Sequence, residues 1–263
     1  MRWLDGRGKK SSAEAPVAER MAAAHEAAAR GDFQTALAIW TPLAHSGVAR
    51  AQNNIGACFA EGLGVARNAT LAERWLMLAA QGGDPVGRRN LATLYFKGEG
   101  IAQNNKHAAE LYRAAAVQGD PAAQDMLSFM LLEGDGVEPD HDEARRWALA
   151  AAEQGLASSM TRLGMIFHNA LGVDRDPAQA VLWWRRGAER GDADGQAMLG
   201  AAYHLGAAVL RDPVEALAWL LRGRDGGSAL AGQFIRAART ALSPEQIAEA
   251  ERRAAAPLPK AAP

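Results

Sequence analysis

The chain has 263 residues, of which 49% are hydrophobic and 22% charged, and its formal net charge at pH 7 is −1. This balance gives no overall electrostatic attraction to nucleic acid or to an anionic membrane. No apolar run approaches the roughly 20 residues that a membrane helix requires, and the lone cysteine excludes an internal disulfide.

The N-terminus lacks the apolar stretch of a secretory signal, because Asp5, Gly6 and Arg7 follow Trp3 and Leu4 directly. We therefore expect a cytoplasmic protein with neither nucleic-acid nor membrane partners. Residues 1–12 are predicted to form a disordered, basic tail.

Residues 13–48 are predicted to form the first helical hairpin. Its first helix is expected to begin near Ser11 or at Pro16, and a tight Gly31-Asp32 turn leads into the second. Ala36 and Trp40 lie four residues apart, as on one helical face.

From residue 49 to residue 228 the sequence repeats itself five times with a period of 36 residues. The clearest marker is the phrase Gly-x-Gly-Val, intact or altered, without any insertion between copies. Self-similarity at such a period indicates stacked units that bury their apolar faces against neighbouring units. The copies of the phrase are Gly62–Val65, Gly98–Ile101, Gly134–Val137, Ala170–Val173 and Gly206–Val209.

Each copy has the pattern of two antiparallel helices. Ala51, Ile55 and Phe59 are spaced four apart, which places them on one face of a first helix. An Asn or Asp then precedes the second helix in every copy, where its side chain can accept from free backbone N–H groups. These predicted N-caps are Asn68, Asn104, Asp140, Asp176 and Asp212.

Large aromatic residues recur on the second helices. The tryptophans Trp75, Trp147, Trp183 and Trp219 share one repeat position and are predicted to fill the space between consecutive hairpins. Trp184 must point elsewhere, either as an exposed contact or as a partly buried neighbour. Cys58 lies beside the packed face and is expected to be a small buried hydrophobe.

Residues 229–254 are predicted to form capping helices with a polar outer face, as a terminal repeat requires. Ser243 is expected to cap the last helix, followed by Pro244 at its first position and Gln246 at its third. Residues 255–263 are small, polar and proline-rich, and are predicted to be a disordered tail that does not pack.

The combination of Gly-x-Gly-Val, a capping Asp or Asn, Ala-x-x-Trp and a closing glycine resembles the Sel1-like repeat, a relative of the tetratricopeptide repeat. The resemblance covers about Ala51 to Gly227, and the hairpin before it is similar to an ordinary tetratricopeptide unit. It implies an all-α fold, a right-handed α/α superhelical solenoid of helix-turn-helix repeats.

The sequence offers no support for catalysis or for a bound cofactor. The Gly-x-Gly pairs lack the third glycine and the preceding strand of a dinucleotide site. No serine is followed by lysine three residues on, as a β-lactamase-like enzyme would need. His168 and His204 share one repeat position, but they lack a matching carboxylate or thiolate, so no metal is expected.

The resemblance places a partner-binding groove along the concave face lined by first helices. Amides and arginine on the early repeats could hold a peptide backbone and a carboxylate, and Phe129 and Met165 could hold apolar side chains. Phe129 and the methionines could equally pack between the helices. The predicted groove residues are Asn53, Asn54, Arg89, Asn90, Asp125, Phe129, Arg162, Met165, His168 and His204.

The function that this sequence favours is a non-catalytic scaffold or adaptor that binds another protein or peptide. The segment of the partner that enters the groove is expected to be acidic and then hydrophobic. The family and the alanine-rich composition favour a bacterial source. Two alternatives stay open, namely an enzyme or small-molecule binder on the same solenoid, and an effector exported without a classical signal. The sequence also leaves open whether the groove or the convex face binds the partner.

Overall fold

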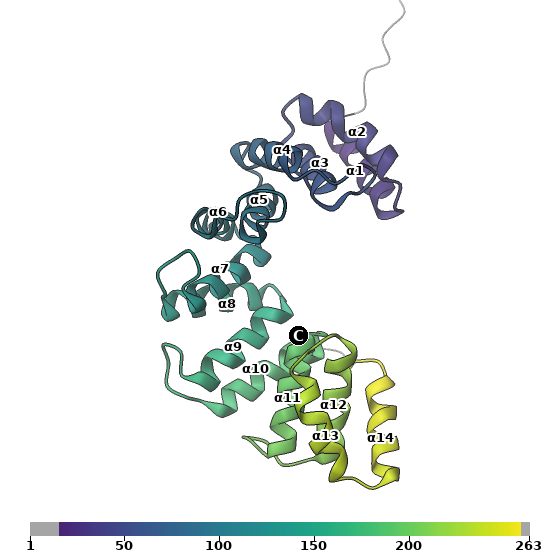
Figure 1. The fold of residues 1–263 in the computed structure, drawn as a ribbon, viewed down its shortest axis with the longest axis vertical. Coiled ribbons are helices and arrows are strands. Elements are labelled where there is room, and N and C mark those ends of the chain that lie inside the picture. The colour runs from purple at the N-terminus through teal and green to yellow at the C-terminus, as the bar shows by residue number, and fades with distance from the viewer. Residues whose placement is uncertain (1–15, 259–263) are drawn as a thin grey trace, which may run out of the picture. The chain divides into compact units, whose positions relative to one another are not determined.

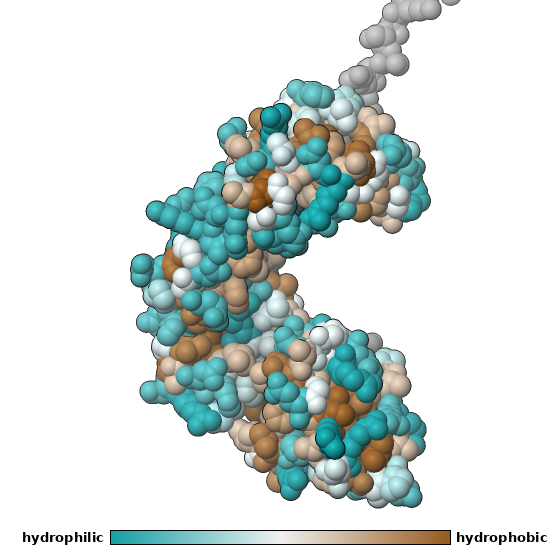
Figure 2. Space-filling view, in the orientation of Figure 1, coloured by the Kyte–Doolittle hydropathy of each residue, from teal (hydrophilic) through white to brown (hydrophobic). Residues whose placement is uncertain are grey.

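The computed structural model describes residues 16–258, and within them every regular element is an α-helix. The predicted all-α solenoid fold is confirmed (Figure 1). The predicted tail at residues 1–12 and the final residues 259–263 lie outside the described residues. Within residues 16–258, no helix has both the length and the hydropathy that crossing a bilayer requires. On the face drawn in Figure 2, hydrophilic and hydrophobic residues are intermixed in both the N-terminal and the C-terminal part.

The chain divides between Gln103 and Asn104 into two compact units, whereas the unbroken period predicts a single array. Each hairpin in a repeat protein contacts only its neighbours, so a regular array can divide into compact units without any break in its sequence period. The helices of the N-terminal unit are α1 (Val17–Ala29), α2 (Phe33–His45), α3 (Ala49–Glu61), α4 (Ala69–Gln81) and α5 (Pro85–Lys97).

The C-terminal unit contains the remaining helices, and within it each helix from α7 to α13 packs on the one before it. They are α6 (Asn105–Val117), α7 (Pro121–Glu133), α8 (His141–Glu153), α9 (Ala157–Asn169), α10 (Pro177–Glu189), α11 (Ala193–Leu205), α12 (Pro213–Asp225), α13 (Ala231–Thr240) and α14 (Pro244–Ala255). First helices of consecutive repeats also touch directly, as α9 and α11 do.

The helix starts are specified by single side chains, as the sequence predicts. All five predicted Asn and Asp caps accept a hydrogen bond from a backbone N–H of the first turn. Asp140, for example, accepts from the N–H of Glu143 at 2.8 Å. Asp84 and Asp120 cap the following first helices in the same way.

The Gly-x-Gly-Val segments form the turns within the hairpins. The first residue of the phrase ends the first helix in the left-handed conformation, for example Gly134 with φ 71°. The second glycine approaches the start of the preceding second helix, where a Cβ at Gly100 would lie 2.7 Å from the Cβ of Ala69. The phrase is therefore a hairpin turn packed on the neighbouring repeat.

The prediction that the repeated tryptophans pack between hairpins is confirmed for Trp75, Trp183 and Trp219, which pack in core clusters that include residues of the preceding hairpin. Three of the four are only half-buried, and Trp219 is 6% exposed. The next residue in each copy is the one that enters the core, because it shares a helical face with the small residues at Ala72 and Ala79. Trp184 occupies this inner position and is 5% exposed, which rules out the exposed contact. The inner residues are Leu76, Tyr112, Ala148, Trp184 and Leu220.

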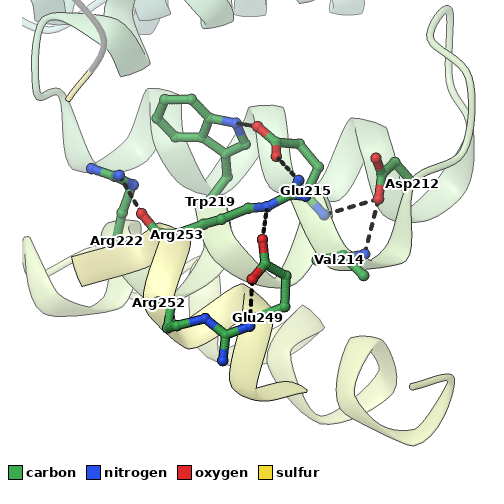
Figure 3. Close-up of polar contacts among 8 residues, drawn as sticks. All are labelled: Asp212, Val214, Glu215, Trp219, Arg222, Glu249, Arg252 and Arg253. Carbon is green, nitrogen blue, oxygen red and sulfur yellow. Dashed lines mark hydrogen bonds and ion pairs between the residues drawn. The ribbon is translucent and has the colours of Figure 1, made fainter. Parts of the chain in front are cut away.

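The C-terminal helix α14 packs on α12, as Figure 3 shows. Arg253 on α14 joins Glu249 of its own helix to Glu215 on α12, with an Nη1 to Oε2 distance of 3.0 Å to Glu215 (Figure 3). Ser243 and Gln246 form the predicted capping box at the start of α14.

The expectation that the tail beyond residue 254 does not pack is wrong for its described part. Ala255 is still helical, and Leu258 packs against the core residues of α10 and α11. The side chain of Leu258 is a branched hydrophobe large enough to bury, unlike the alanines and prolines around it.

Candidate partner-binding groove

A groove of about 430 Å³ crosses the first helices of the C-terminal unit. It is formed by side chains from α7, α9 and α11 and from the turn before α13. The lining residues are Phe129, Leu132, Glu133, Ser158, Thr161, Arg162, Met165, Asn169, Leu171, Asp192, Asp194, Met198 and Leu230.

The floor of the groove is apolar and partly accessible. Phe129, Met165, Met198 and Leu230 are half-buried, so each presents part of its side chain to the groove while the rest packs on the helices. Met130, in contrast, is fully buried and belongs to the core. The structure therefore brings Phe129 and Met165 together at one surface.

Arg162 and Asp125 join α9 to α7 at the edge of this groove. Arg162 Nε donates to Asp125 Oδ1 at 3.2 Å, and the guanidinium lies 5.4 Å from the centroid of the Phe129 ring. Asp125 also accepts from the hydroxyls of Ser159 at 2.6 Å and Ser158 at 3.1 Å. Asp125 is 8% exposed, so it holds two first helices together and is not an open contact surface.

On the opposite edge, α9 is joined to α11. Thr161 Oγ1 donates to Asp192 Oδ2 at 2.6 Å, and the same carboxylate caps α11 by accepting from the N–H of Gly195 at 2.7 Å. Asp194 accepts from the hydroxyl of Ser228 at 2.6 Å. Both carboxylates line the groove and are positioned by neutral donors.

In the N-terminal unit, the predicted amide residues form a network between α3 and α5. Asn90 Nδ2 donates to Asn53 Oδ1 at 2.8 Å, whereas the side-chain amide of Asn54 contacts the His25 ring of α1 at 3.1 Å. Arg89 is half-buried and donates to Asn90 Oδ1 at 3.4 Å. The prediction that Asn53 faces an open groove is wrong, because close packing of consecutive first helices leaves it 3% exposed.

The two predicted histidines do not line the groove of the C-terminal unit. The ring of His168 packs on Trp184 with 5.3 Å between centroids, which places it against the second helix of its own hairpin. His204 is half-buried at the corresponding position on α11. Among residues 16–258, no three His, Cys, Asp or Glu side chains come together in a way that could hold a metal ion.

Several groove residues escape sequence reasoning, above all Asp192, Asp194, Met198 and Leu230. Asp192 does carry a signal, since it occupies the capping position of Asp84 and Asp120 in the first-helix series. Met198 also carries a signal, because it lies 36 residues after Arg162 and so shares the repeat position of the predicted groove residues Asn54, Asn90 and Arg162. Leu230 comes from the turn before α13, whose path the 36-residue pattern does not specify.

The arrangement is a stack of helical hairpins with an apolar-floored groove, which is the architecture of an α-solenoid repeat protein. The chain belongs to the Sel1 repeat family, whose sequence model matches five consecutive segments, at residues 49–84, 85–120, 121–156, 157–192 and 193–228. Sel1 repeat solenoids generally serve as scaffolds for protein–protein interaction.

Solved structures give the same family assignment. A Sel1 repeat protein from Oxalobacter formigenes is 30% identical, with a TM-score of 0.77 over 88% of this chain and 96% of that one. A protective antigen of uropathogenic Escherichia coli strains, which displays an SLR fold, is 29% identical with a TM-score of 0.82. That match covers 89% of this chain but only 51% of the antigen, so this chain spans about half its length. No curated protein matches the sequence.

Proposed function

We propose that this protein is a non-catalytic scaffold that binds a peptide segment or a partner helix in the groove of its C-terminal unit. The observation that carries the proposal is the half-buried apolar floor formed by Phe129, Met165 and Met198, bounded by polar side chains on both edges. Sites that anchor peptides combine such an apolar floor with a polar rim.

The ionisable groups around the groove support binding over catalysis. Asp125 is held by Arg162 and two serines, and Asp192 uses its Oδ2 atom to cap α11 and to accept from Thr161. These contacts position the helices, because Asp125 joins α7 to α9 and Asp192 joins α11 to α9.

The N-terminal unit contributes a smaller hollow of about 300 Å³, lined in part by Ala57, Asn90 and Thr93. We propose that Arg89 and Asn90 provide a secondary contact for a partner, while Asn53 holds α3 against α5 and Asn54 holds α3 against α1. This assignment follows from the burial of Asn53 and the partial exposure of Arg89.

The proposal is tested by selecting 12-residue peptides on the full chain from a random display library. The selected peptides are then measured against Met165→Ala and the control Met77→Ala. Met77 is 37% exposed on α4, so both substitutions remove a partly exposed methionine, but only the first lies in the groove. Melting temperatures of both variants show whether folding is preserved.

We expect Met165→Ala to weaken the selected peptides about tenfold, which corresponds to about 1.4 kcal/mol, and Met77→Ala to leave them unchanged. Truncating a methionine at a contact removes roughly this much apolar burial. Failure to enrich any peptide, or equal binding by both variants, would contradict the proposed groove function.

A further inference from the structure

The rim of the groove carries an excess of negative charge. Glu133, Asp192 and Asp194 line it, and among the described residues Arg162 is the basic side chain that does so. Asp125 already forms an ion pair with Arg162, since their side chains are 12% and 19% exposed and 3.2 Å apart. The negative charge of the three lining carboxylates is therefore not balanced by a basic side chain among the lining residues.

The hydrogen bonds that hold two of these carboxylates orient them without cancelling their charge. Asp192 accepts from a threonine hydroxyl and a backbone N–H, and Asp194 accepts from a serine hydroxyl. The N-terminus of α11 adds a positive partial charge of roughly half a unit beside Asp192. Three full negative charges outweigh it, and Glu133 and Asp194 are exposed and so available to a ligand.

The floor between these carboxylates is apolar. Leu132 and Leu171 join Phe129, Met165, Met198 and Leu230 along it. Methionine side chains adapt to ligand groups of different shapes, and a carboxylate rim attracts ammonium or guanidinium groups. A ligand that satisfies both parts must carry apolar side chains and positive charges on one short segment.

We propose that the segment bound in this groove is cationic and amphipathic, with Leu, Phe or Met side chains on the floor and Lys or Arg side chains at Glu133, Asp192 and Asp194. This inference rests on the proposed scaffold function and specifies the partner's chemistry. It reverses, for the C-terminal unit, the acidic ligand that Arg89 and the amides suggest from sequence. The reversal comes from Asp192 and Asp194, which only the fold brings to the groove.

The test uses two fluorescein-labelled 12-residue peptides with identical leucine and phenylalanine positions. One carries lysine and the other glutamate at the remaining charged positions, and fluorescence anisotropy measures their binding to the full chain. The key variant is Glu133→Gln, Asp192→Asn and Asp194→Asn together. Asparagine is as good an N-cap as aspartate, so Asp192→Asn keeps the start of α11 intact.

The matched control is Glu110→Gln, Asp142→Asn and Asp225→Asn together. It removes the same number of charges from exposed positions of the same unit, where the side chains are 61%, 68% and 63% exposed. None of these residues lines the groove. The control therefore separates attraction by the groove from attraction by the net charge of the protein.

We expect the lysine peptide to bind at least tenfold more tightly than the glutamate peptide at about 50 mM salt, and the preference to shrink at about 500 mM, where the Debye length is short. The groove variant should lose most of the preference and the control variant should keep it. If both variants lost the preference for the lysine peptide equally, the preference would come from the net charge of the protein and the proposed role of the groove carboxylates would be wrong.

Two further outcomes separate this inference from the proposed function. If both peptides bind equally and both weaken in Met165→Ala, the cationic assignment is wrong and the scaffold function stands. If neither peptide binds in a manner that depends on Met165, both the cationic assignment and the groove function are wrong.

Discussion

Arg162 and Asp125 form an ion pair that joins the first helices of two consecutive repeats, with 3.2 Å between Nε and Oδ1. The carboxylate also receives the hydroxyl of Ser159, a side chain with no exposed surface. This contact fixes α9 against α7 and thereby shapes the groove edge where Phe129 lies.

Asp125→Ala should lower the free energy of unfolding by about 3 kcal/mol, because it leaves a buried hydroxyl and a partly buried guanidinium without their acceptor. Arg162→Ala should lower the free energy of unfolding by less, because Asp125 still accepts hydrogen bonds from Ser158 and Ser159. Urea unfolding measures both, and Asp225→Ala, at an exposed side chain, is expected to stay within about 0.5 kcal/mol. If Asp125→Ala lowered the free energy of unfolding no more than Asp225→Ala does, Asp125 would not hold α7 and α9 together.

Gly164→Ala should destabilise the C-terminal unit by about 1–3 kcal/mol through overpacking. A Cβ at this position would overlap Cδ1 and Nε1 of Trp184 and would lie 2.9 Å from the carbonyl oxygen of Ala180. Gly232→Ala is the matched control, since a Cβ there meets nothing within 4 Å, and removing a helical glycine should be neutral or stabilising by up to about 1 kcal/mol. We expect urea unfolding to show a lower free energy of unfolding for Gly164→Ala and an equal or higher one for Gly232→Ala. An unchanged free energy of unfolding for Gly164→Ala would contradict the close approach of α9 to α10 at Trp184.

The thiol of Cys58 should be unreactive in the native protein. Burial raises its pKa to about 11 from an ordinary value of 9.0, and the residue is 2% exposed. A rise of two units reduces the thiolate fraction at pH 8 about 100-fold, and the core blocks access as well. Reaction with a disulfide reagent should be negligible in buffer and complete in denaturant, so rapid labelling of the native chain would refute the packing of α3.

Glu143 should make stability depend on acid pH. Its hydrogen bonds with the Arg113 guanidinium hold the pKa of this carboxyl below its usual value of 4.5, and the Trp147 indole N–H, donating at 3.0 Å, lowers it further. A lowered pKa stabilises the folded state at pH values above 4.5, and this contribution is lost as the pH falls through the folded-state pKa. The melting-temperature difference between the native chain and Glu143→Gln should therefore close between pH 7 and pH 3. A constant difference would show that the carboxylate charge is not involved.

The local features of this fold can be predicted from sequence because they depend on residues close together in the chain. Each capping Asn or Asp acts on a backbone N–H two or three residues ahead, so Asp140 can be recognised without knowledge of the fold. The turn glycines are recognisable for the same reason, since a left-handed residue ends the helix that precedes it.

The groove depends on contacts between repeats, which a single copy does not specify. Phe129 and Met165 lie 36 residues apart and so share one repeat position, and both line the groove beside Arg162. Asn53 and Asp125 share a different repeat position, four residues before that of Phe129, and both are buried, because the distance between consecutive first helices decides exposure. The acidic rim is missed because Asp192 occupies a capping position and no repeated residue type marks Asp194, and only the packing of α9 on α11 brings both to the groove.

The most direct measurement of the central claim is a methyl NMR titration of the full chain labelled with ¹³C at the methionine methyl groups. The chain has 8 methionines, and Met165 and Met198 line the groove, whereas Met77 lies on α4 and Met130 is in the core. Adding the lysine-containing amphipathic peptide should shift the Met165 and Met198 methyl signals first, with little change at Met77 and Met130. Shifts at Met77 with Met165 and Met198 unmoved would contradict the account.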